Sequence, residues 1–173
     1  MGAVSSILSD LISDVVFTPV HVVEAERISS RFTRVRLAGR AFERGNWTPG
    51  AKLQLRTQPG TMTLRTYTPV APFDSSTKTS ADLIAYHHGD GPGAHWFDRA
   101  STGLQCEVFG PSRSLDLSDS NGAAPFIGDE TSVALAMALR NVNPGSRLVF
   151  EATAPKELSS LLSGLGLSTD VEV

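Results

Sequence analysis

The chain has 173 residues, a formal net charge of −3 and 40% hydrophobic residues. This ordinary apolar content, with fifteen glycines and ten prolines, excludes a disordered or collagen-like chain. No run of about 18 apolar residues occurs, so we expect no integral membrane association. The first sixteen residues carry no lysine or arginine and the only cysteine is Cys106, which argues against a secretory signal and a disulfide framework. We therefore expect a cytoplasmic protein.

Basic residues are concentrated in one part of the chain. Residues 27–65 contain nine basic residues and one acidic residue, whereas residues 119–173 contain three basic and seven acidic residues. An anionic ligand is therefore expected to bind the basic stretch. A simpler interpretation is that many of these arginines lie on the solvated face of strands, as the alternation of Arg, Val, Arg and Leu over residues 34–37 indicates. Because the stretch lacks interleaved aromatic residues and the whole chain is acidic, no nucleic-acid partner is expected.

The first half of the chain predicts a short helix followed by β structure. Apolar residues recur at helical spacing over residues 5–16, which indicates an amphipathic helix. The pattern then changes to short, alternating, β-branched runs separated by turns rich in glycine and proline. Strands are predicted over residues 20–28, 33–37, 52–56, 64–68, 83–87 and 104–109. Six short strands at this spacing predict a small antiparallel barrel or sandwich.

The second half predicts a change of architecture. A helix interrupts the β region over residues 91–102, with Pro92 well suited to its first position. Beyond residue 122 strands and helices alternate. The strands are predicted over residues 125–127, 147–152 and from 170 onward, and the helices over residues 131–142 and 156–165. This order predicts a parallel sheet that about 50 residues are too few to complete.

Several familiar sites are missing from the sequence. No Walker-type phosphate loop occurs, and residues 110–114 lack the second glycine of a hydrolase nucleophile elbow. The histidines at positions 87, 88 and 95 lack the spacing with carboxylates or cysteines that a metal cage needs. We therefore expect no metal site.

The first candidate binding segment is Arg65-Thr66-Tyr67-Thr68. On a strand, Arg65 and Tyr67 point to one face while the two threonines point to the other. An arginine two positions from an aromatic ring offers a phosphate clamp beside a stacking platform. The same pattern also describes an ordinary cross-strand face.

The second candidate segment is His-Gly-Asp-Gly-Pro-Gly-Ala-His-Trp, at residues 88–96. It places a glycine-rich turn directly before a helix, where free backbone N–H groups and the positive helix end can hold a phosphate. The alternative is that the glycines only make a strand-to-helix turn. Together the two segments predict a ligand with an aromatic ring system and a pyrophosphate.

The order of these motifs resembles that of the siderophore-interacting family of FAD-dependent ferric-siderophore reductases, within the ferredoxin-NADP reductase superfamily. The resemblance covers about residues 18–155. Its motifs are Arg-Thr-Tyr-Thr at 65–68, His-Gly-Asp-Gly-Pro at 88–92, Val-Phe-Gly-Pro at 108–111 and Phe-Ile-Gly-Asp-Glu-Thr at 126–131. It implies a β plus α/β fold. An N-terminal amphipathic segment (1–17) precedes an antiparallel six-stranded β-barrel FAD domain (18–118) and a partial, parallel-sheet NAD(P)H-binding α/β domain (119–173).

The resemblance also implies roles for individual residues. Arg65 pairs with an FAD phosphate, Tyr67 packs along the flavin and ribityl chain, and Thr68 faces the flavin near N5. The glycine-rich loop surrounds the pyrophosphate, and Thr131 approaches the nicotinamide. The full set of implied cofactor-binding residues is Arg65, Thr66, Tyr67, Thr68, His88, Gly91, Pro92, Gly93, Ala94, Asp129, Glu130 and Thr131. No side chain is expected to act as a catalytic residue, Thr68 being the nearest candidate.

The implied activity is reduction of a ferric siderophore with NAD(P)H as electron donor and release of Fe(II), the redox chemistry belonging to FAD. Two departures from the family pattern predict modest FAD affinity. Residues 69–71 carry no basic residue, and residues 91–94 read Gly-Pro-Gly-Ala where Gly-Pro-Ala-Ser is common. Three alternatives stay open: a related flavin oxidoreductase with another acceptor, a non-catalytic flavin- or siderophore-binding module, and a β-barrel that binds nothing.

Overall fold

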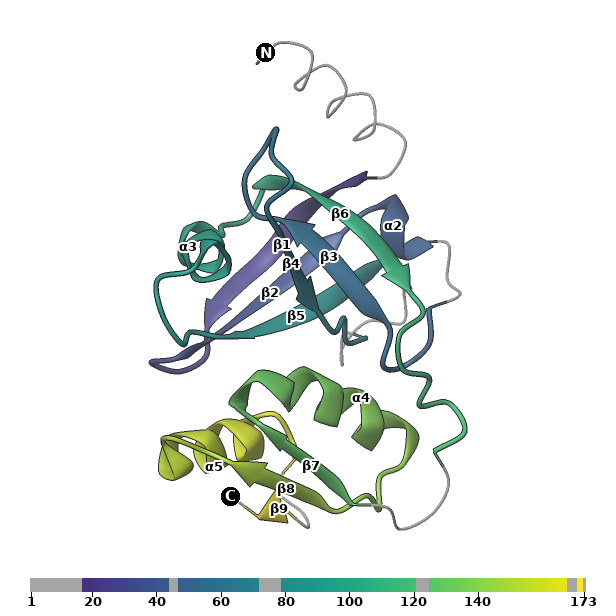
Figure 1. Cartoon of the computed structure of the whole chain (residues 1–173), viewed down its shortest axis with the longest axis vertical. Helices are drawn as coiled ribbons and strands as arrows, with labels where there is room; N and C mark the ends of the chain where they lie inside the picture. Colours follow the sequence, from purple (N-terminus) through teal and green to yellow (C-terminus); the bar gives the residue numbers. More distant parts are fainter. Residues whose placement is uncertain (1–16, 44–46, 72–78, 121–124, 168–170, 173) are drawn as a thin grey trace.

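The computed structural model describes residues 17–43, 47–71, 79–120, 125–167 and 171–172, and the structural statements below concern these residues. The chain forms an antiparallel unit within residues 17–112 and a parallel unit within residues 126–172, which lie one above the other in Figure 1. The helix predicted over residues 5–16 lies outside the described residues.

The antiparallel unit is a six-stranded sheet, as predicted. Its strands are β1 (Thr18–Arg27), β2 (Phe32–Ala38), β3 (Lys52–Arg56), β4 (Leu64–Tyr67), β5 (Ser80–Tyr86) and β6 (Gln105–Ser112). They pair antiparallel in the order β4-β3-β6-β1-β2-β5. The strand boundaries differ from the predicted ones by a few residues, because alternation shows where a strand faces the core better than where its ladder ends.

The sheet curls until its two edge strands approach each other, but no continuous ladder between β4 and β5 closes it within the described residues. An isolated bridge joins Val70, just beyond β4, to Asp82 in β5. The two residues exchange backbone hydrogen bonds of 2.9 and 2.8 Å. The predicted barrel is therefore a strongly curled open sheet.

Alternating side chains give the sheet its core. Val35 and Leu37 on β2 are fully buried, while Arg34 and Arg36 lie on the other face, as the sequence predicts. The interior is closed at one side by α3 (Pro92–Arg99), whose Trp96 packs into the same core. A four-residue helix, α2 (Arg40–Glu43), was not predicted, since one turn is too short to show a helical period.

The parallel unit has the predicted βαβαβ order. A three-stranded parallel sheet has the order β7-β8-β9. Its elements are β7 (Phe126–Asp129), the 3-10 turn η1 (Glu130–Ser132), α4 (Val133–Val142), β8 (Leu148–Glu151), α5 (Pro155–Gly164) and β9 (Val171–Glu172). No helix in the described ranges is long and apolar enough to cross a membrane.

The two units share a hydrophobic core. In Figure 1, α4 lies between the small sheet and the antiparallel unit. Phe32 and Ile84 of the antiparallel unit belong to one buried cluster with Ala134 and Met137 of α4. The start of α4 is thereby held beside β5 and the loop that follows it. The domain boundaries at residues 17 and 118 stay predictions.

Candidate functional site

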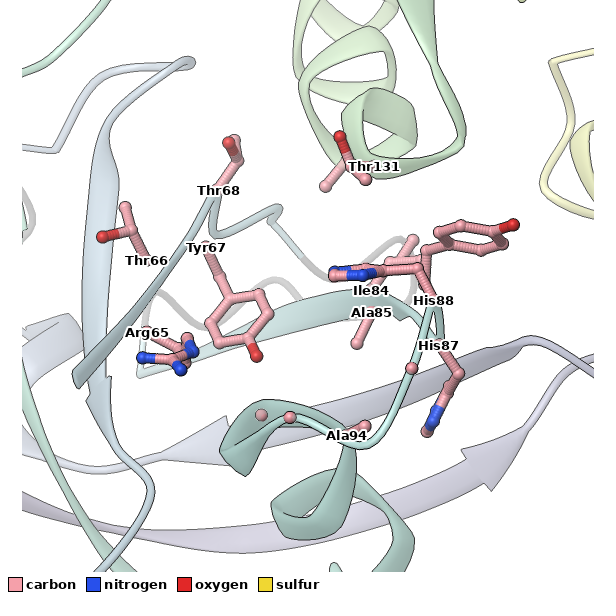
Figure 2. Close-up of a pocket in the computed structure, with 15 residues that line it drawn as sticks. Arg65, Thr66, Tyr67, Thr68, Ile84, Ala85, His87, His88, Ala94 and Thr131 are labelled. Atoms are coloured by element: carbon pink, nitrogen blue, oxygen red, sulfur yellow. The ribbon is translucent and has the colours of Figure 1, made fainter. Parts of the chain in front are cut away.

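A pocket of about 340 Å³ lies where β4, β5, the N-terminus of α3 and the start of α4 meet (Figure 2). Its lining residues are Arg65, Thr66, Tyr67, Thr68, Ile84, Ala85, Tyr86, His87, His88, Gly89, Gly91, Gly93, Ala94, Thr131 and Ala134. The fold thus gathers in one pocket all the site residues expected from the sequence except Pro92, Asp129 and Glu130. The cofactor contacts expected of these residues stay predictions.

Tyr67 forms the floor of the pocket beside α3. Its ring packs edge-on against Phe97, with centroids 5.2 Å apart. A Cβ added to Gly93 would lie 2.6 Å from the Tyr67 hydroxyl oxygen, so only glycine permits this approach without a shift. Burial raises the pKa of Tyr67 to about 12 although the nearby Arg65 charge opposes the change. At neutral pH the side chain is therefore a neutral aromatic surface.

Arg65 borders the pocket and has no acidic partner among the residues that the structure describes. Its Nη1 donates to the Leu64 carbonyl oxygen at 2.8 Å, and no carboxylate of the described residues lies within salt-bridge distance. Other arginines of the basic stretch are paired with acids from other strands. These pairs include Arg34–Glu26 at 2.8 Å, Arg36–Asp82 at 2.7 Å and Arg56–Glu107 at 2.7 Å. The tertiary fold therefore neutralises much of the basic stretch and leaves Arg65 available for an anion.

The N-terminus of α3 faces the same pocket. Gly91 is its N-cap, and no side chain accepts a hydrogen bond there. Gly93 and Ala94, in the first turn, line the pocket. Uncapped N–H groups at a helix N-terminus favour an anionic group, because the helix dipole is positive there. Pro92 instead lines a neighbouring pocket of about 280 Å³.

Thr131 contributes to the pocket from the parallel unit. Figure 2 shows it at the edge of the pocket formed by the start of α4, between Thr68 and His88. Asp129 holds Thr131 in this position, since its Oδ1 accepts from the Thr131 backbone N at 2.9 Å and from the Thr131 hydroxyl at 2.6 Å. Asp129 therefore shapes the turn and does not line the pocket.

Glu130 is buried and turned away from the pocket. Its Oε1 accepts hydrogen bonds from the Thr153 backbone N at 2.6 Å and the Thr153 hydroxyl at 2.7 Å. Burial alone would raise the pKa of Glu130, but the hydrogen bonds from Thr153 outweigh it and lower the pKa. The carboxylate ties the end of β7 to the loop after β8.

Sequence analysis predicted His88 but did not identify Ile84, Ala85, Tyr86 and His87, which β5 and its end bring to the pocket. Tyr86 and His88 lie two positions apart, with ring centroids 6.1 Å apart, so strand alternation into the His-Gly segment could have placed both on one face. His87 also borders the pocket, but its ring turns toward α3. Its Nε2 lies 2.8 Å from the Thr33 hydroxyl and its Nδ1 lies 3.6 Å from Asp98. Burial lowers the pKa of His87.

No group of three or more metal-ligating side chains occurs in the part of the chain that the structure describes. The pocket combines instead a neutral aromatic surface, one guanidinium and a helix N-terminus. This combination suits a ligand with a planar ring and a phosphate.

The sequence matches no protein-family model and no curated protein. Several solved structures are similar to this chain in fold. The siderophore-interacting protein from Acinetobacter baumannii shares 16% identity at a TM-score of 0.70, over 90% of this chain and 65% of that chain. The siderophore-interacting protein SipS from Aeromonas hydrophila shares 18% identity at a TM-score of 0.66, over 91% of this chain and 66% of that chain.

Phthalate dioxygenase reductase, described as a modular structure for electron transfer from pyridine nucleotides to a 2Fe–2S centre, is also similar. It shares 17% identity at a TM-score of 0.70, over 92% of this chain and 52% of that chain. The chain has a ferredoxin-NADP reductase-like fold. It spans about two thirds of the length of the two siderophore-interacting proteins and about half of that of the dioxygenase reductase.

Proposed function

We propose that the chain is an FAD-binding, NAD(P)H-dependent oxidoreductase that reduces ferric siderophores in the cytoplasm. The observation that carries the proposal is the meeting of Arg65, Tyr67 and the α3 N-terminus in one pocket, with Thr131 opposite. The pocket volume of about 340 Å³ lies within the range of small-molecule sites. We assign residues 18–118 to the FAD domain and residues 119–173 to a partial NAD(P)H domain.

The residues present fit FAD. Arg65 has a guanidinium with no carboxylate beside it in the described chain, and the uncapped first turn of α3 offers N–H donors for a second charge. Tyr67 supplies a partly buried, neutral ring for stacking. When bound, FAD would supply the conversion of a two-electron donation by NAD(P)H into one-electron steps to Fe(III). Arg65, Tyr67 and the α3 turn bind and orient it, and no side chain is required to act as acid or base.

Thr68 and Thr131 flank the space where the two redox partners meet. The two threonines come from different units and both line the pocket (Figure 2). Thr131 is held by Asp129, so its hydroxyl oxygen keeps acceptor capacity toward the pocket. We assign Thr68 to the flavin side and Thr131 to the nicotinamide side. The siderophore-interacting neighbours support the choice of a ferric siderophore as electron acceptor.

A second candidate keeps the flavin chemistry and changes the acceptor to an iron–sulfur centre. The TM-score to phthalate dioxygenase reductase equals that to the Acinetobacter siderophore-interacting protein, 0.70 in both cases. The two candidates share every residue assignment made above, and only the acceptor distinguishes them.

Three measurements in sequence test the proposal. FAD titration, followed by flavin fluorescence, is expected to show saturable binding. Anaerobic NADH or NADPH is then expected to bleach the bound flavin. A ferric siderophore, added with a ferrous chelator, is expected to reoxidise the flavin and give the coloured Fe(II) complex. A 2Fe–2S ferredoxin is not expected to reoxidise the flavin. Absence of FAD binding would overturn the proposal, and reoxidation by the ferredoxin alone would favour the second candidate.

A further inference from the structure

A polar network joins the two units beside the pocket. Figure 1 shows the turn between β1 and β2 next to α5. Glu157 of α5 reaches this turn, and its Oε1 accepts from the Ser29 hydroxyl at 2.7 Å, the Ser30 hydroxyl at 2.7 Å and the Arg31 backbone N at 3.0 Å. One carboxylate oxygen thus receives three donors from residues 126 to 128 positions away in the chain.

The Arg31 side chain extends the network toward the pocket. Its Nη1 donates to the Tyr86 hydroxyl at 3.2 Å and to the Thr153 hydroxyl at 3.0 Å. The Thr153 hydroxyl proton is donated to Glu130, so Tyr86, whose hydroxyl lies 3.1 Å from that of Thr153, is the donor in their contact. The network therefore has a consistent direction from Arg31 through Thr153 to Glu130.

The network reaches the pocket lining at two points. Tyr86 lines the pocket from the antiparallel unit, and Glu130 directly precedes Thr131, which lines it from the parallel unit. The described parts of the two units also share an apolar cluster, which includes Ile84 and Met137. Apolar packing is non-directional, whereas hydrogen bonds weaken steeply when misaligned. The polar network is therefore what can fix the rotation of one unit against the other.

The ion pair between Arg31 and Glu157 contributes little to global stability. The Arg31 Nε and Glu157 Oε2 atoms are 3.9 Å apart, and the two side chains are 45% and 23% exposed. Exposed pairs of this kind contribute about 0–1 kcal/mol. Directional contacts of Arg31 and Glu157 that have little effect on stability are better suited to alignment than to holding the fold together.

We propose that Arg31 and Glu157 are positioning residues that align Thr131 with the Tyr67–Thr68 side of the pocket, so that a bound pyridine nucleotide reaches the flavin. The proposal rests on the proposed function. Neither residue lines the pocket. Arg31 acts through Tyr86, Thr153 and Glu130, and Glu157 acts by holding Arg31 and its turn. Loss of the network is expected to slow flavin reduction without weakening FAD binding.

Single-turnover kinetics test the proposal in the FAD-loaded protein. In Arg31→Ala we expect the limiting rate of anaerobic flavin reduction by NAD(P)H to fall roughly 10- to 100-fold, the scale of a small misalignment of reactants. The dissociation constant of FAD and the half-saturating NAD(P)H concentration are expected to change less than about threefold, since substrate contacts persist. Arg31→Lys, which keeps a charged donor, is expected to recover part of the rate.

Arg113→Ala is the matched control. Arg113 is exposed like Arg31, but it lies outside both the pocket and the network. Its reduction rate is expected to equal that of the wild type. Equal rates in Arg31→Ala and Arg113→Ala, with FAD bound normally, would overturn the positioning role alone. Wild-type protein that binds no FAD would overturn the proposed function and the positioning role with it.

Amide hydrogen exchange gives a readout that does not depend on activity. The Arg31 N–H is bonded to Glu157, so Glu157→Ala is expected to accelerate its exchange by about tenfold or more while exchange in β3 and β6 is unchanged. Unchanged exchange at Arg31 would mean that α5 does not hold this turn in solution, and the proposal would fail.

Discussion

The Tyr67 hydroxyl occupies the space beside Gly93 that a larger residue would need. A Cβ at position 93 would lie 2.6 Å from the phenolic oxygen and 3.4 Å from Cγ of Arg65. The glycine of the α3 turn and the aromatic residue of β4 are therefore matched to each other. The alanine common at this position in the family that the sequence resembles would require Tyr67 to move.

Gly93→Ala tests this match. We expect it to displace Tyr67, to destabilise the protein by about 1–3 kcal/mol through overpacking and to weaken FAD binding. In a Tyr67→Phe background the hydroxyl is gone, and the higher helix propensity of alanine, worth up to about 1 kcal/mol, remains. The cost of Gly93→Ala measured by urea denaturation is therefore expected to shrink or change sign. If Gly93→Ala lowered the free energy of unfolding equally with Tyr67 and with Phe at position 67, the Tyr67 hydroxyl would not be what restricts position 93.

The ionisation of Tyr67 gives a second prediction. Burial raises its pKa from 10.0 to about 12, so the folded protein holds this proton more tightly than the unfolded chain. The contribution of protonated Tyr67 to the free energy of unfolding is fully present below pH 10 and is lost as the pH rises from 10 toward 12. The chain has two tyrosines, so Tyr86→Phe leaves Tyr67 as the only phenol for an ultraviolet titration. A midpoint near 10 in folded protein would mean that the ring is solvated.

Arg65→Ala is expected to weaken FAD binding and leave the fold intact. A hydrogen bond to a charged group contributes about 1.5–3 kcal/mol, which corresponds to a rise in the dissociation constant of roughly 10-fold or more. Because Arg65 is exposed, the urea midpoint should change little. Arg113→Ala, another exposed arginine outside the pocket, serves as control. Equal FAD affinity in the two variants would show that Arg65 does not hold the phosphate.

Glu130→Ala is expected to destabilise the protein. It removes the charged acceptor of two hydrogen bonds from Thr153, and a hydrogen bond to a charged group contributes about 1.5–3 kcal/mol to the free energy of unfolding. Hydrogen bonds from Thr153 overcome the effect of burial and lower the pKa of Glu130 below 4.5, so this difference from the wild type should persist at neutral pH and shrink as the pH falls below about 4.5.

The control for this variant is Glu151→Ala. Glu151 pairs with Asp129 in the register of the parallel sheet and is exposed. Its removal should change the free energy of unfolding by no more than about 0.5 kcal/mol. If both glutamate variants lost the same stability, the Thr153 contacts would not explain the effect.

Local patterns in the sequence predicted the elements of this protein well. The alternation at residues 34–37 identified the buried face of β2, and the change from period two to helical spacing identified the βαβαβ order. The motifs at residues 65–68 and 88–94 could also be recognised as parts of one site. These patterns are local because burial of one face repeats along a strand or helix regardless of its partners.

Contacts between distant segments could not be found in this way. The sequence shows a basic stretch, but only the fold brings Asp82 and Glu107 to Arg36 and Arg56 and leaves Arg65 without an acid of the described chain beside it. The sequence shows that Glu130 precedes Thr131. It does not show that the Glu130 carboxylate turns toward Thr153 while Thr131 faces the pocket.

The contact between Arg31 and Glu157 has no local signature at all. A residue's own neighbours in the chain indicate whether it faces water or core, whereas its partner depends on how the sheets curl and pack. The sequence alone therefore predicts that residues 65–68 can bind a ligand with a phosphate and an aromatic ring. The alignment of the two units around that chemistry exists only in the folded molecule, because hydrogen bonds across 126 residues form only when the units are packed together.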